Sequence, residues 1–348
     1  MKNFYTLKIK NLTILLLLAG ISSIAQTSPT TFGGSMDLYY KYDFSKHQTG
    51  YTSFTNSNDS FELGMASIEA SHKLGKASGF VDLGFGTRAS EFTYNDQATS
   101  FMIKQLYITY DFSPKFKVIA GSFATHLGYE LLDAVDNKNY SMSYAFSYGP
   151  FFNTGIKAQY TSGKYSYMIG VTNPTDFKTA TEAGSTQKTI IGQISYTGST
   201  GSLYLNFTSG SSNPSSAKNK TQIDLVGTKK INDKLSLGFN GTYSKVDDDF
   251  DSSLDGSWFA LIGYANYSIK ENLSLAYRLE YFDDKDGVVS TFPTGANVIG
   301  NTLSLNYKEG NLIFIPEIRF DSASKTIFAA DNPSKTSTFA LIGMTYSF

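Results

Sequence analysis

Charged side chains stand two or four residues apart in several short stretches, with apolar residues between them. In residues 36–44, for example, Asp37 and Lys41 alternate with leucine, tyrosine and phenylalanine. Because side chains of a β-strand point alternately to its two faces, such charges share one face, where they would meet water and passing ions. The charged residues expected on this inner face are Asp37, Lys41, Asp82, Lys117, Arg278, Glu280, Glu317 and Arg319, with Arg88 on the same face at the end of its segment.

Groups that could catalyse a reaction or bind a metal are sparse. The chain has no cysteine, and its three histidines are His47, His72 and His126. His126 stands near Thr125 and Glu130, a set that a barrel phospholipase could use, but a packed or solvated histidine is the simpler interpretation. The acidic run 247–255 lacks the spacing of an EF-hand. The sequence therefore predicts no enzyme, no metal site and no cofactor.

The elements that would carry the inner-face charges are β-strands. Within residues 272–282, Leu275 and Tyr277 fall on one face of a strand, and Arg278 and Glu280 fall on the other. The same alternation predicts sixteen segments, most of a length that suits a tilted membrane-crossing strand. These segments lie near residues 34–44, 61–73, 78–87, 101–112, 115–123, 153–161, 164–172, 188–197, 201–209, 220–230, 234–245, 257–269, 272–283, 298–307, 311–320 and 337–348.

The connections between these segments alternate between seven short turns and eight long loops. An outer-membrane barrel has short turns on the periplasmic side and long loops outside. A soluble β-sandwich is the alternative, but the apolar face stays rich in leucine and tyrosine through all the segments, with no blunted edge strand. The sequence predicts an all-β fold, a closed antiparallel transmembrane β-barrel of about 16 strands, wide enough for an aqueous channel.

The first residues have the three-part plan of a secretory signal peptide. Lysines at the start are followed by an apolar run over 12–20, and small residues at 23 and 25 predict cleavage before Gln26. The expected organisation is a signal peptide at 1–25 and one barrel domain at 26–348. Cleavage removes three lysines from a chain with 29 basic and 30 acidic residues. The remaining acidic balance is too mild to suggest a nucleic-acid partner.

The third long loop, about residues 124–152, is far more apolar and aromatic than the other loops. A long apolar loop needs a surface to pack against. In general porins the third loop folds into the barrel, and this loop is similar in position and length. We therefore expect it to narrow the pore, with a fold over the barrel mouth as the alternative. The constriction charges would then be Glu130, Asp133, Asp136 and Lys138.

Six stretches of the chain carry a resemblance to a known family: 82–88, 103–110, 121–130, 139–144, 148–155 and 173–176. Together they resemble the OmpL-like porin-2 β-barrel family of Bacteroidetes-type bacteria. The resemblance implies an outer-membrane porin of a Gram-negative bacterium, which passes small hydrophilic solutes by diffusion. The alternative is a structural or adhesive barrel with a closed pore and ligand-binding outer loops.

The expected partners follow from this location. They are outer-membrane lipid and lipopolysaccharide, small hydrophilic solutes, and the barrel-assembly machinery. That machinery recognises terminal aromatic strands like the one ending in Phe348. A homo-oligomer is compatible with sixteen strands, although no contact for one can be identified in the sequence.

Overall fold

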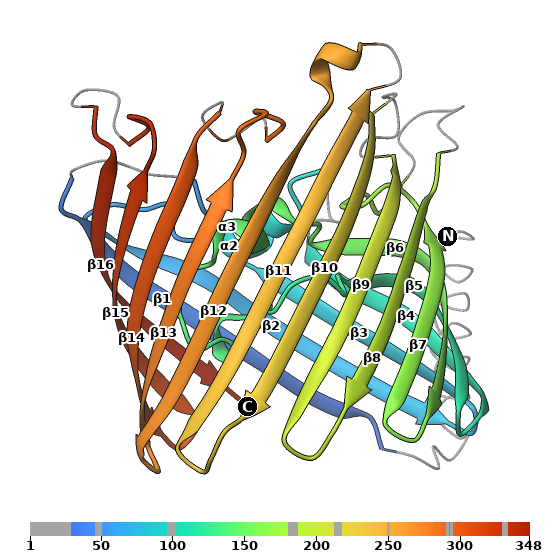
Figure 1. Ribbon diagram of the computed structural model, residues 1–348. Coiled ribbons are helices and arrows are strands. Elements are labelled where there is room, and N and C mark those ends of the chain that lie inside the picture. Colours follow the sequence, from blue (N-terminus) through green and yellow to red (C-terminus); the bar gives the residue numbers. More distant parts are fainter. Residues whose placement is uncertain are drawn as a thin grey trace, which may run out of the picture.

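The computed structural model describes residues 29–45, 51–95, 102–179, 187–211, 218–248, 251–289, 292, 295–328 and 333–348. Within them, sixteen antiparallel strands pair in chain order and the first pairs with the last, which makes a closed barrel (Figure 1). The predicted 16-stranded barrel is confirmed. The predicted signal peptide lies outside the described residues.

The strand bounds agree with the predicted segments to within three residues at most ends. The strands are β1 Thr31–Asp43, β2 Ser60–Leu74, β3 Ala77–Phe85, β4 Ile103–Ser113, β5 Phe116–Ala124, β6 Phe152–Ser162, β7 Tyr165–Thr172, β8 Thr189–Thr197, β9 Gly201–Ser211, β10 Lys218–Lys230, β11 Leu235–Asp248, β12 Gly256–Lys270, β13 Leu273–Asp283, β14 Asn297–Glu309, β15 Leu312–Ala323 and β16 Thr336–Ser347.

The alternation that predicts these strands also sorts their side chains. On β13, Tyr277 and Leu279 are 38% and 46% exposed on the outside, whereas Arg278 and Glu280 are 0% and 1% exposed inside the barrel. Exposed leucine, isoleucine, tyrosine and phenylalanine recur on the outer face of every strand. An apolar surface this extensive suits hydrocarbon rather than water.

Closure of the barrel depends on the pairing of β1 with β16. The register runs from Ser35 opposite Ser347 to Asp43 opposite Phe339. Beyond the strand end, the N–H of Phe348 donates to the carbonyl of Gly34 at 3.0 Å and the Gly34 N–H donates back at 3.1 Å. An open edge in hydrocarbon would leave such groups unpaired at a cost of several kcal/mol each, so closure is what makes a membrane sheet stable.

Register shifts interrupt the pairing of four pairs of described strands, and two of these shifts affect inward residues discussed below. In β2, Met65 lies opposite Asp37 while Leu63 lies opposite Leu38, so Gly64 is the extra residue. The sequence predicts an irregularity here, because the apolar phase of this segment slips beside Met65. In β4, a second shift beside Asp82 lets Lys104 turn inward next to another inward residue.

The connections divide the barrel into two ends. Seven short hairpins lie at one end, here called the turn end, and longer segments lie at the other, the loop end. The loop-end segments contain the helices α2 Thr87–Phe92 and α3 Tyr144–Tyr148 and the short helices η2 Ala134–Asp136 and η3 Ser252–Leu254. None of the helices in the described ranges is long and apolar enough to cross a membrane.

Candidate functional site in the barrel interior

The segment between β5 and β6, residues 125–151, lies inside the barrel, and we call it the inner segment. Figure 1 shows its helix α3 beside α2 within the ring of strands. The N–H of Gly128 donates to Asp224 on β10 at 3.0 Å, and the N–H of Tyr140 donates to Glu317 on β15 at 2.7 Å. Strands well separated around the ring thus hold one segment, which crosses the interior.

Arg278 on β13 holds the middle of the inner segment. Its Nη1 donates to Glu130 Oε1 at 2.6 Å, and its Nη2 donates to the carbonyl of Met142 at 3.3 Å. Glu130 also accepts the N–H and O–H of Ser143, the residue that caps α3. These groups are buried, and a buried ion pair is stable only where hydrogen bonds satisfy its other polar atoms. Arg278 therefore fixes the segment and the start of α3 together.

A second arginine extends this network along β15. Arg319 donates to Asp321 at 2.8 Å, to Glu280 at 2.9 Å and to the carbonyl of Met142 at 2.7 Å. The hydroxyl of Tyr144 donates to Asp321 at 2.9 Å, and its N–H donates to Glu280 at 2.8 Å. Arg278, Glu280 and Arg319 are thus matched by charges of these two strands or by the inner segment.

The far side of the inner segment is bound to β1 and β4. Lys104 lies between Asp133 of the segment, at 2.7 Å, and Asp82 of β3, at 3.1 Å. Arg88 of α2 lies 3.7 Å from Asp37, and that carboxylate also accepts the hydroxyl of Tyr140. The segment is therefore fixed by charge on both sides of the β1–β16 seam.

Two glycines let aromatic rings of the inner segment approach the wall. A Cβ added at Gly343 on β16 would collide with the ring of Tyr140. A Cβ added at Gly238 on β11 would come within 2.6 Å of the ring of Tyr129. Side chains at these positions would displace the segment, so the wall is shaped to receive it.

Two aromatic clusters fill much of the loop end of the interior. α3 lies between them, with Tyr144 in one cluster and Phe146 in the other. The first cluster includes Tyr144, Trp258, Phe282, Phe292 and Phe328. The second includes Phe54, Phe92, Phe146, Phe151 and Phe152.

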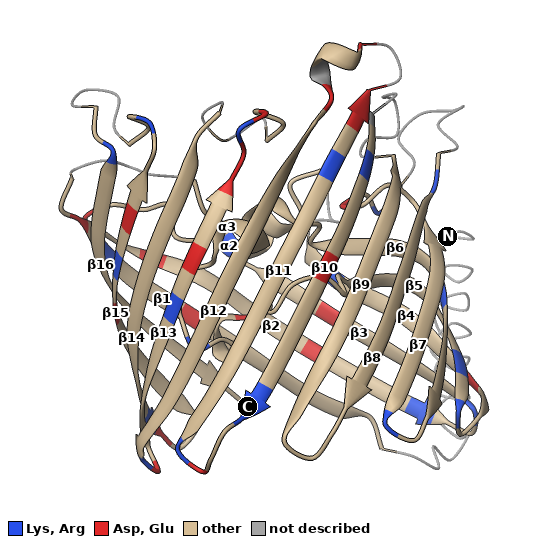
Figure 2. Ribbon diagram, viewed as in Figure 1, with Lys and Arg blue, Asp and Glu red and all other residues tan. Residues whose placement is uncertain are grey.

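The interior has two unlike walls. The anchored wall, β13–β16 with β1–β4, carries the ion pairs to the inner segment. On the open wall, β5–β11, strands β7, β8 and β9 carry no charged residue, and β8 and β9 are tan along their length in Figure 2. The first residues of the inner segment cross the open wall at Asp224 and Asn240.

A cavity of about 560 Å³ lies between the inner segment and the open wall. Its wall side is polar and mostly uncharged, and Asp136 and Lys138 border it from the inner segment. The wall residues include Gln193, Ser202, Tyr204, Asn206, Thr228, Ser236 and, from β12, Asn266. Amides and hydroxyls of this kind can exchange hydrogen bonds with water and small polar solutes.

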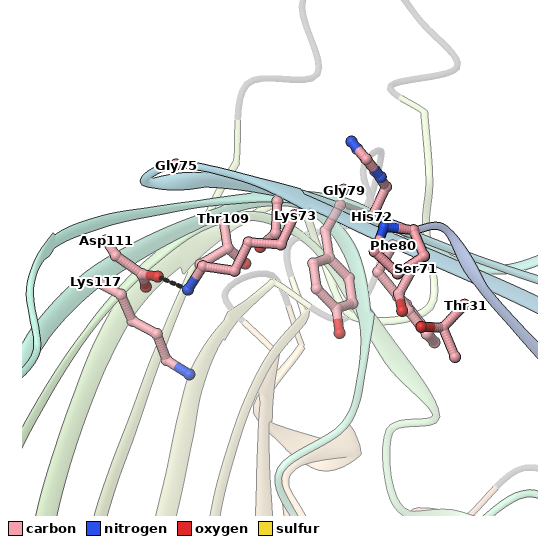
Figure 3. A pocket seen from close by; sticks show the side chains of 13 residues that line it. Thr31, Ser71, His72, Lys73, Gly75, Gly79, Phe80, Thr109, Asp111 and Lys117 are labelled. Atoms are coloured by element: carbon pink, nitrogen blue, oxygen red, sulfur yellow. Dashed lines mark hydrogen bonds and ion pairs between the residues drawn. The ribbon is translucent and has the colours of Figure 1, made fainter. Parts of the chain in front are cut away.

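A second cavity, of about 640 Å³, opens at the turn end of β1–β5. Lys73 is ion-paired with Asp111 at 2.6 Å, and the ammonium of Lys117 points away from that pair (Figure 3). The remaining lining is largely hydroxyl-bearing, with Tyr107 and Thr109 from β4. This cavity therefore has a basic rim.

The structure places the predicted inner-face residues of the strands inside the barrel, but in separate groups. Arg278, Glu280 and Arg319 form one network with Glu130, and Asp82 joins Lys104. Lys41 donates to the carbonyl of Thr55, Glu317 binds the backbone of the inner segment, and Lys117 faces the turn-end cavity.

The predicted position of Arg88 is wrong in one respect. It lies in α2 and not on the strand, because the chain turns at Gly86 and forms a helix there. Its side chain is nevertheless fully buried in the interior, next to Asp37 and 5.3 Å from the ring centroid of Tyr140.

The four expected constriction charges differ in their surroundings. Glu130 and Asp133 are tied to Arg278 and Lys104, as described above. Asp136, at the end of η2, and Lys138 border the cavity. Burial and the nearby Asp133 raise the pKa of the Asp136 carboxyl. Glu130 and Asp133 therefore anchor the segment, and Glu130, Asp136 and Lys138 line the cavity.

Some interior charges are absent from the sequence-based set. These are Lys104, Lys157, Lys220, Asp224 and Asp321. Lys220, Asp224 and Asp321 obey the alternation of their strands and could have been found by extending it. Lys104 could not, because the bulge in β4 breaks the alternation at that residue.

A catalytic arrangement around His126 is not formed. Its Nε2 lies 3.0 Å from the carbonyl oxygen of Phe207, while Glu130 is bound to Arg278. Burial lowers the pKa of His126 to about 4, so the ring is neutral at pH 7. Within the described ranges, no group of three or more histidine, aspartate or glutamate side chains could hold a metal ion.

The sequence matches one family model over residues 29–348, described as "Putative beta-barrel porin-2, OmpL-like". No curated protein matches the chain at the sequence level. The family match therefore covers nearly the whole chain, including all sixteen strands and the inner segment.

Solved structures with a similar fold are outer-membrane barrels. A loop-deletion form of OmpT from Vibrio cholerae has a TM-score of 0.62 and 11% identity over 92% of this chain and 99% of that one. An anion-selective porin from Comamonas acidovorans has a TM-score of 0.60 and 12% identity over 92% and 100%. The channel DcaP of Acinetobacter baumannii has a TM-score of 0.59 and 13% identity over 92% and 97%. At these identities the likeness shows the fold alone.

Proposed function

The chain belongs to the OmpL-like β-barrel porin-2 family and is an outer-membrane porin of a Gram-negative bacterium, and we propose that it passes small hydrophilic solutes by passive diffusion through water. The observation that carries this proposal is the polar cavity of about 560 Å³ that the inner segment leaves beside the open wall. The turn end would face the periplasm and the loop end the exterior. Family and fold favour a channel over an enzyme.

The inner segment would set the narrowest point of this channel. Ordering its aromatic residues costs conformational entropy, which burial against the anchored wall offsets. Glu130 and Asp133 would hold the segment in place through Arg278 and Lys104. A passing solute would then meet Asp136 and Lys138, and beside them Glu130, whose charge Arg278 balances.

Conductance in planar lipid bilayers tests this function. The purified, folded barrel should insert in discrete steps of ohmic conductance. A barrel in which residues 132–144 are replaced by a short glycine–serine linker should conduct more per step, because the crossing segment is shortened. Retained heat-modifiable mobility on gels would show that both proteins are folded. Equal conductance of the two folded proteins would rule out the inner segment as the constriction.

A closed barrel with ligand-binding outer loops is the second candidate. The aromatic clusters around Tyr144 and Phe146 favour it, since they fill much of the loop end of the interior. In that case the intact protein would show no conductance steps, while the linker variant would. A conducting intact protein would exclude this candidate.

The remaining expectations concern processing and partners. We expect export with cleavage before Gln26, which the N-terminal mass of protein from outer membranes would test. The outward face of β16 and the exposed Phe348 would contact membrane lipid and the barrel-assembly machinery. Lipopolysaccharide would surround the loop end, and cross-linking in membranes would show whether the barrels form homo-oligomers.

A further inference from the structure

The open wall carries three inward lysines at three heights. Lys117 is near the turn end of β5, Lys157 is in the middle of β6, and Lys220 is near the loop end of β10. They follow the wall from one mouth of the barrel towards the other.

These lysines have no carboxylate in direct contact, although Asp111 lies opposite Lys117 in the pairing of β4 with β5 and Asp176 is near Lys220. Within the described part of the chain, neither Lys117 nor Lys157 forms an ion pair, and the Nζ of Lys157 lies 3.8 Å from the ring centroid of Phe123. The Nζ of Lys220 donates to the carbonyl of Tyr148 at 3.0 Å. An ammonium that no carboxylate contacts keeps much of its potential in the space before it, and this applies most to Lys157.

Most carboxylates of the interior have a bonded partner in the protein. On the open wall, Asp224 is fully buried and its oxygens accept hydrogen bonds from Asn206, Asn240 and Thr242. Asp37 of β1, Asp82 of β3, Glu280 of β13 and Glu317 of β15 are bound to arginine, lysine or the inner segment. Glu69 of β2, Asp111 of β4 and Asp136 face the interior from the anchored side.

Unpartnered polar atoms on the open wall mark a place for buried water beside the inner segment. Thr208, Gln222 and Ser244 are at least nine-tenths buried, and each has a side-chain oxygen with no protein hydrogen-bond partner. They form one row, because Gln222 pairs in register with Thr208 on β9 and with Ser244 on β11. Buried polar atoms require partners, and water is the partner that this row can take.

This row lies beside Lys220, the lysine nearest the loop end. A small cavity of about 10 Å³, room for roughly one water, is lined by Lys220, Gln222 and Thr208 together with Pro150 of the inner segment. The place for buried water and the three lysines therefore lie on the same wall, the open wall.

We propose that the channel runs along the open wall and that Lys117, Lys157 and Lys220 make it select small anionic solutes, such as carboxylates and phosphates, over cations. This inference rests on the proposed channel function. Each lysine lowers the energy of an anion and raises that of a cation at its height in the passage. The narrow, low-dielectric surroundings strengthen the effect, which orders the two kinds of ion without binding either tightly.

Zero-current potentials across bilayers in a KCl gradient test the proposal. The intact barrel should pass chloride in preference to potassium by roughly fivefold, the order expected when one unit charge about 8 Å away in water favours the anion and disfavours the cation equally. Lys157→Gln should lower this ratio severalfold, and Lys157→Glu should reverse it. Lys164→Gln is the matched control, since it removes the same charge from an exposed hairpin residue between β6 and β7 and should leave the ratio unchanged.

The outcomes separate this proposal from the channel function beneath it. A folded barrel that never conducts would overturn both. A conducting barrel with a chloride-to-potassium ratio of one or less would overturn the anion preference alone, as would equal ratios for Lys157→Gln and Lys164→Gln. In 1 M KCl the preference should weaken, because the screening length falls to about 3 Å.

Discussion

The anchored wall and the open wall have the same alternation of outward and inward side chains, but their inward side chains have different roles. On the anchored wall, inward positions carry arginine, glutamate and aspartate that bind the inner segment, as Arg278 binds Glu130. On the open wall, they carry mostly serine, threonine, asparagine and glutamine, with a few lysines. An inward charge is therefore not always a pore charge, because its role depends on whether the segment crossing the barrel pairs with it.

The largest effect should come from breaking the anchored wall. Arg278→Ala leaves Glu130 and Glu280 buried without their arginine, so the free energy of unfolding should fall by about 3–5 kcal/mol. Thermal unfolding, followed by gel mobility, measures this. On the open wall, Thr228→Ala removes hydrogen bonds with the N–H and the hydroxyl of Ser202 and should cost about 1 kcal/mol. Similar costs at the two sites would contradict the distinction between the walls.

A smaller effect should follow from changing the surface that receives the inner segment. Gly343→Ala puts a methyl group where the ring of Tyr140 lies, so we expect a loss of about 1–3 kcal/mol and a raised conductance. Gly263→Ala is the control, because a Cβ there meets no atom within 4 Å. If the two alanine variants have the same free energy of unfolding, the packing of Tyr140 does not require a glycine on β16.

The pH dependence of one loop-end contact should be smaller again. Asp176 accepts the N–H groups of Phe151 and Phe152 at 2.7 and 3.0 Å, where the inner segment joins the open wall. Burial raises the pKa of the Asp176 carboxyl to about 6. A carboxyl with a raised folded-state pKa binds protons more readily when folded, so the folded structure around Asp176 should gain stability, on the order of 1 kcal/mol, as the pH falls from 7 towards 4. The gain comes from removing a buried charge, because the two N–H groups themselves favour the ionised form.

Hydrogen exchange at the two phenylalanine amides, corrected for the intrinsic effect of pH, measures this gain. Asp176→Asn should remove the dependence on pH, because the amide does not titrate. Slower exchange at pH 7 than at pH 5 in the intact protein would show the opposite sign.

The smallest effect on stability should be at the segment's free carboxylate. Asp136 borders the cavity and belongs to no ion pair in the described chain, so Asp136→Asn should change the free energy of unfolding by about 0.5 kcal/mol or less. It should still shift the zero-current potential towards anions. Glu130→Gln, by contrast, should destabilise the fold, since it weakens the pair with Arg278. Unchanged selectivity in Asp136→Asn would place the passage away from η2.

The strands could be predicted from the sequence because lipid outside and water inside require the same alternation of apolar and polar side chains in every strand. That rule places Tyr277 outside and Arg278 inside without any knowledge of their neighbours. The position and length of the third loop could also be identified. The face to which each inner charge belongs is thus a local property of the chain.

The partners of those charges are not a local property. Arg278 and Glu130 are 148 residues apart, and nothing in the pattern around either residue identifies the other. The inward turn of Lys104 depends on a bulge that the alternation does not reveal, and Arg88 depends on a helix of only six residues. The division into an anchored and an open wall therefore emerged only from the three-dimensional arrangement.

The reach of the inner segment also constrains the order of assembly. Its bonds to Glu317, Glu280 and Asp321 join residues 136 to 177 positions apart, on strands that come last in the chain. The segment therefore cannot dock before β13–β15 are in place, and contacts of such long range form slowly. We expect a late folding phase in which an already closed barrel draws this segment inward, so that the pore exists in a wide form before it narrows.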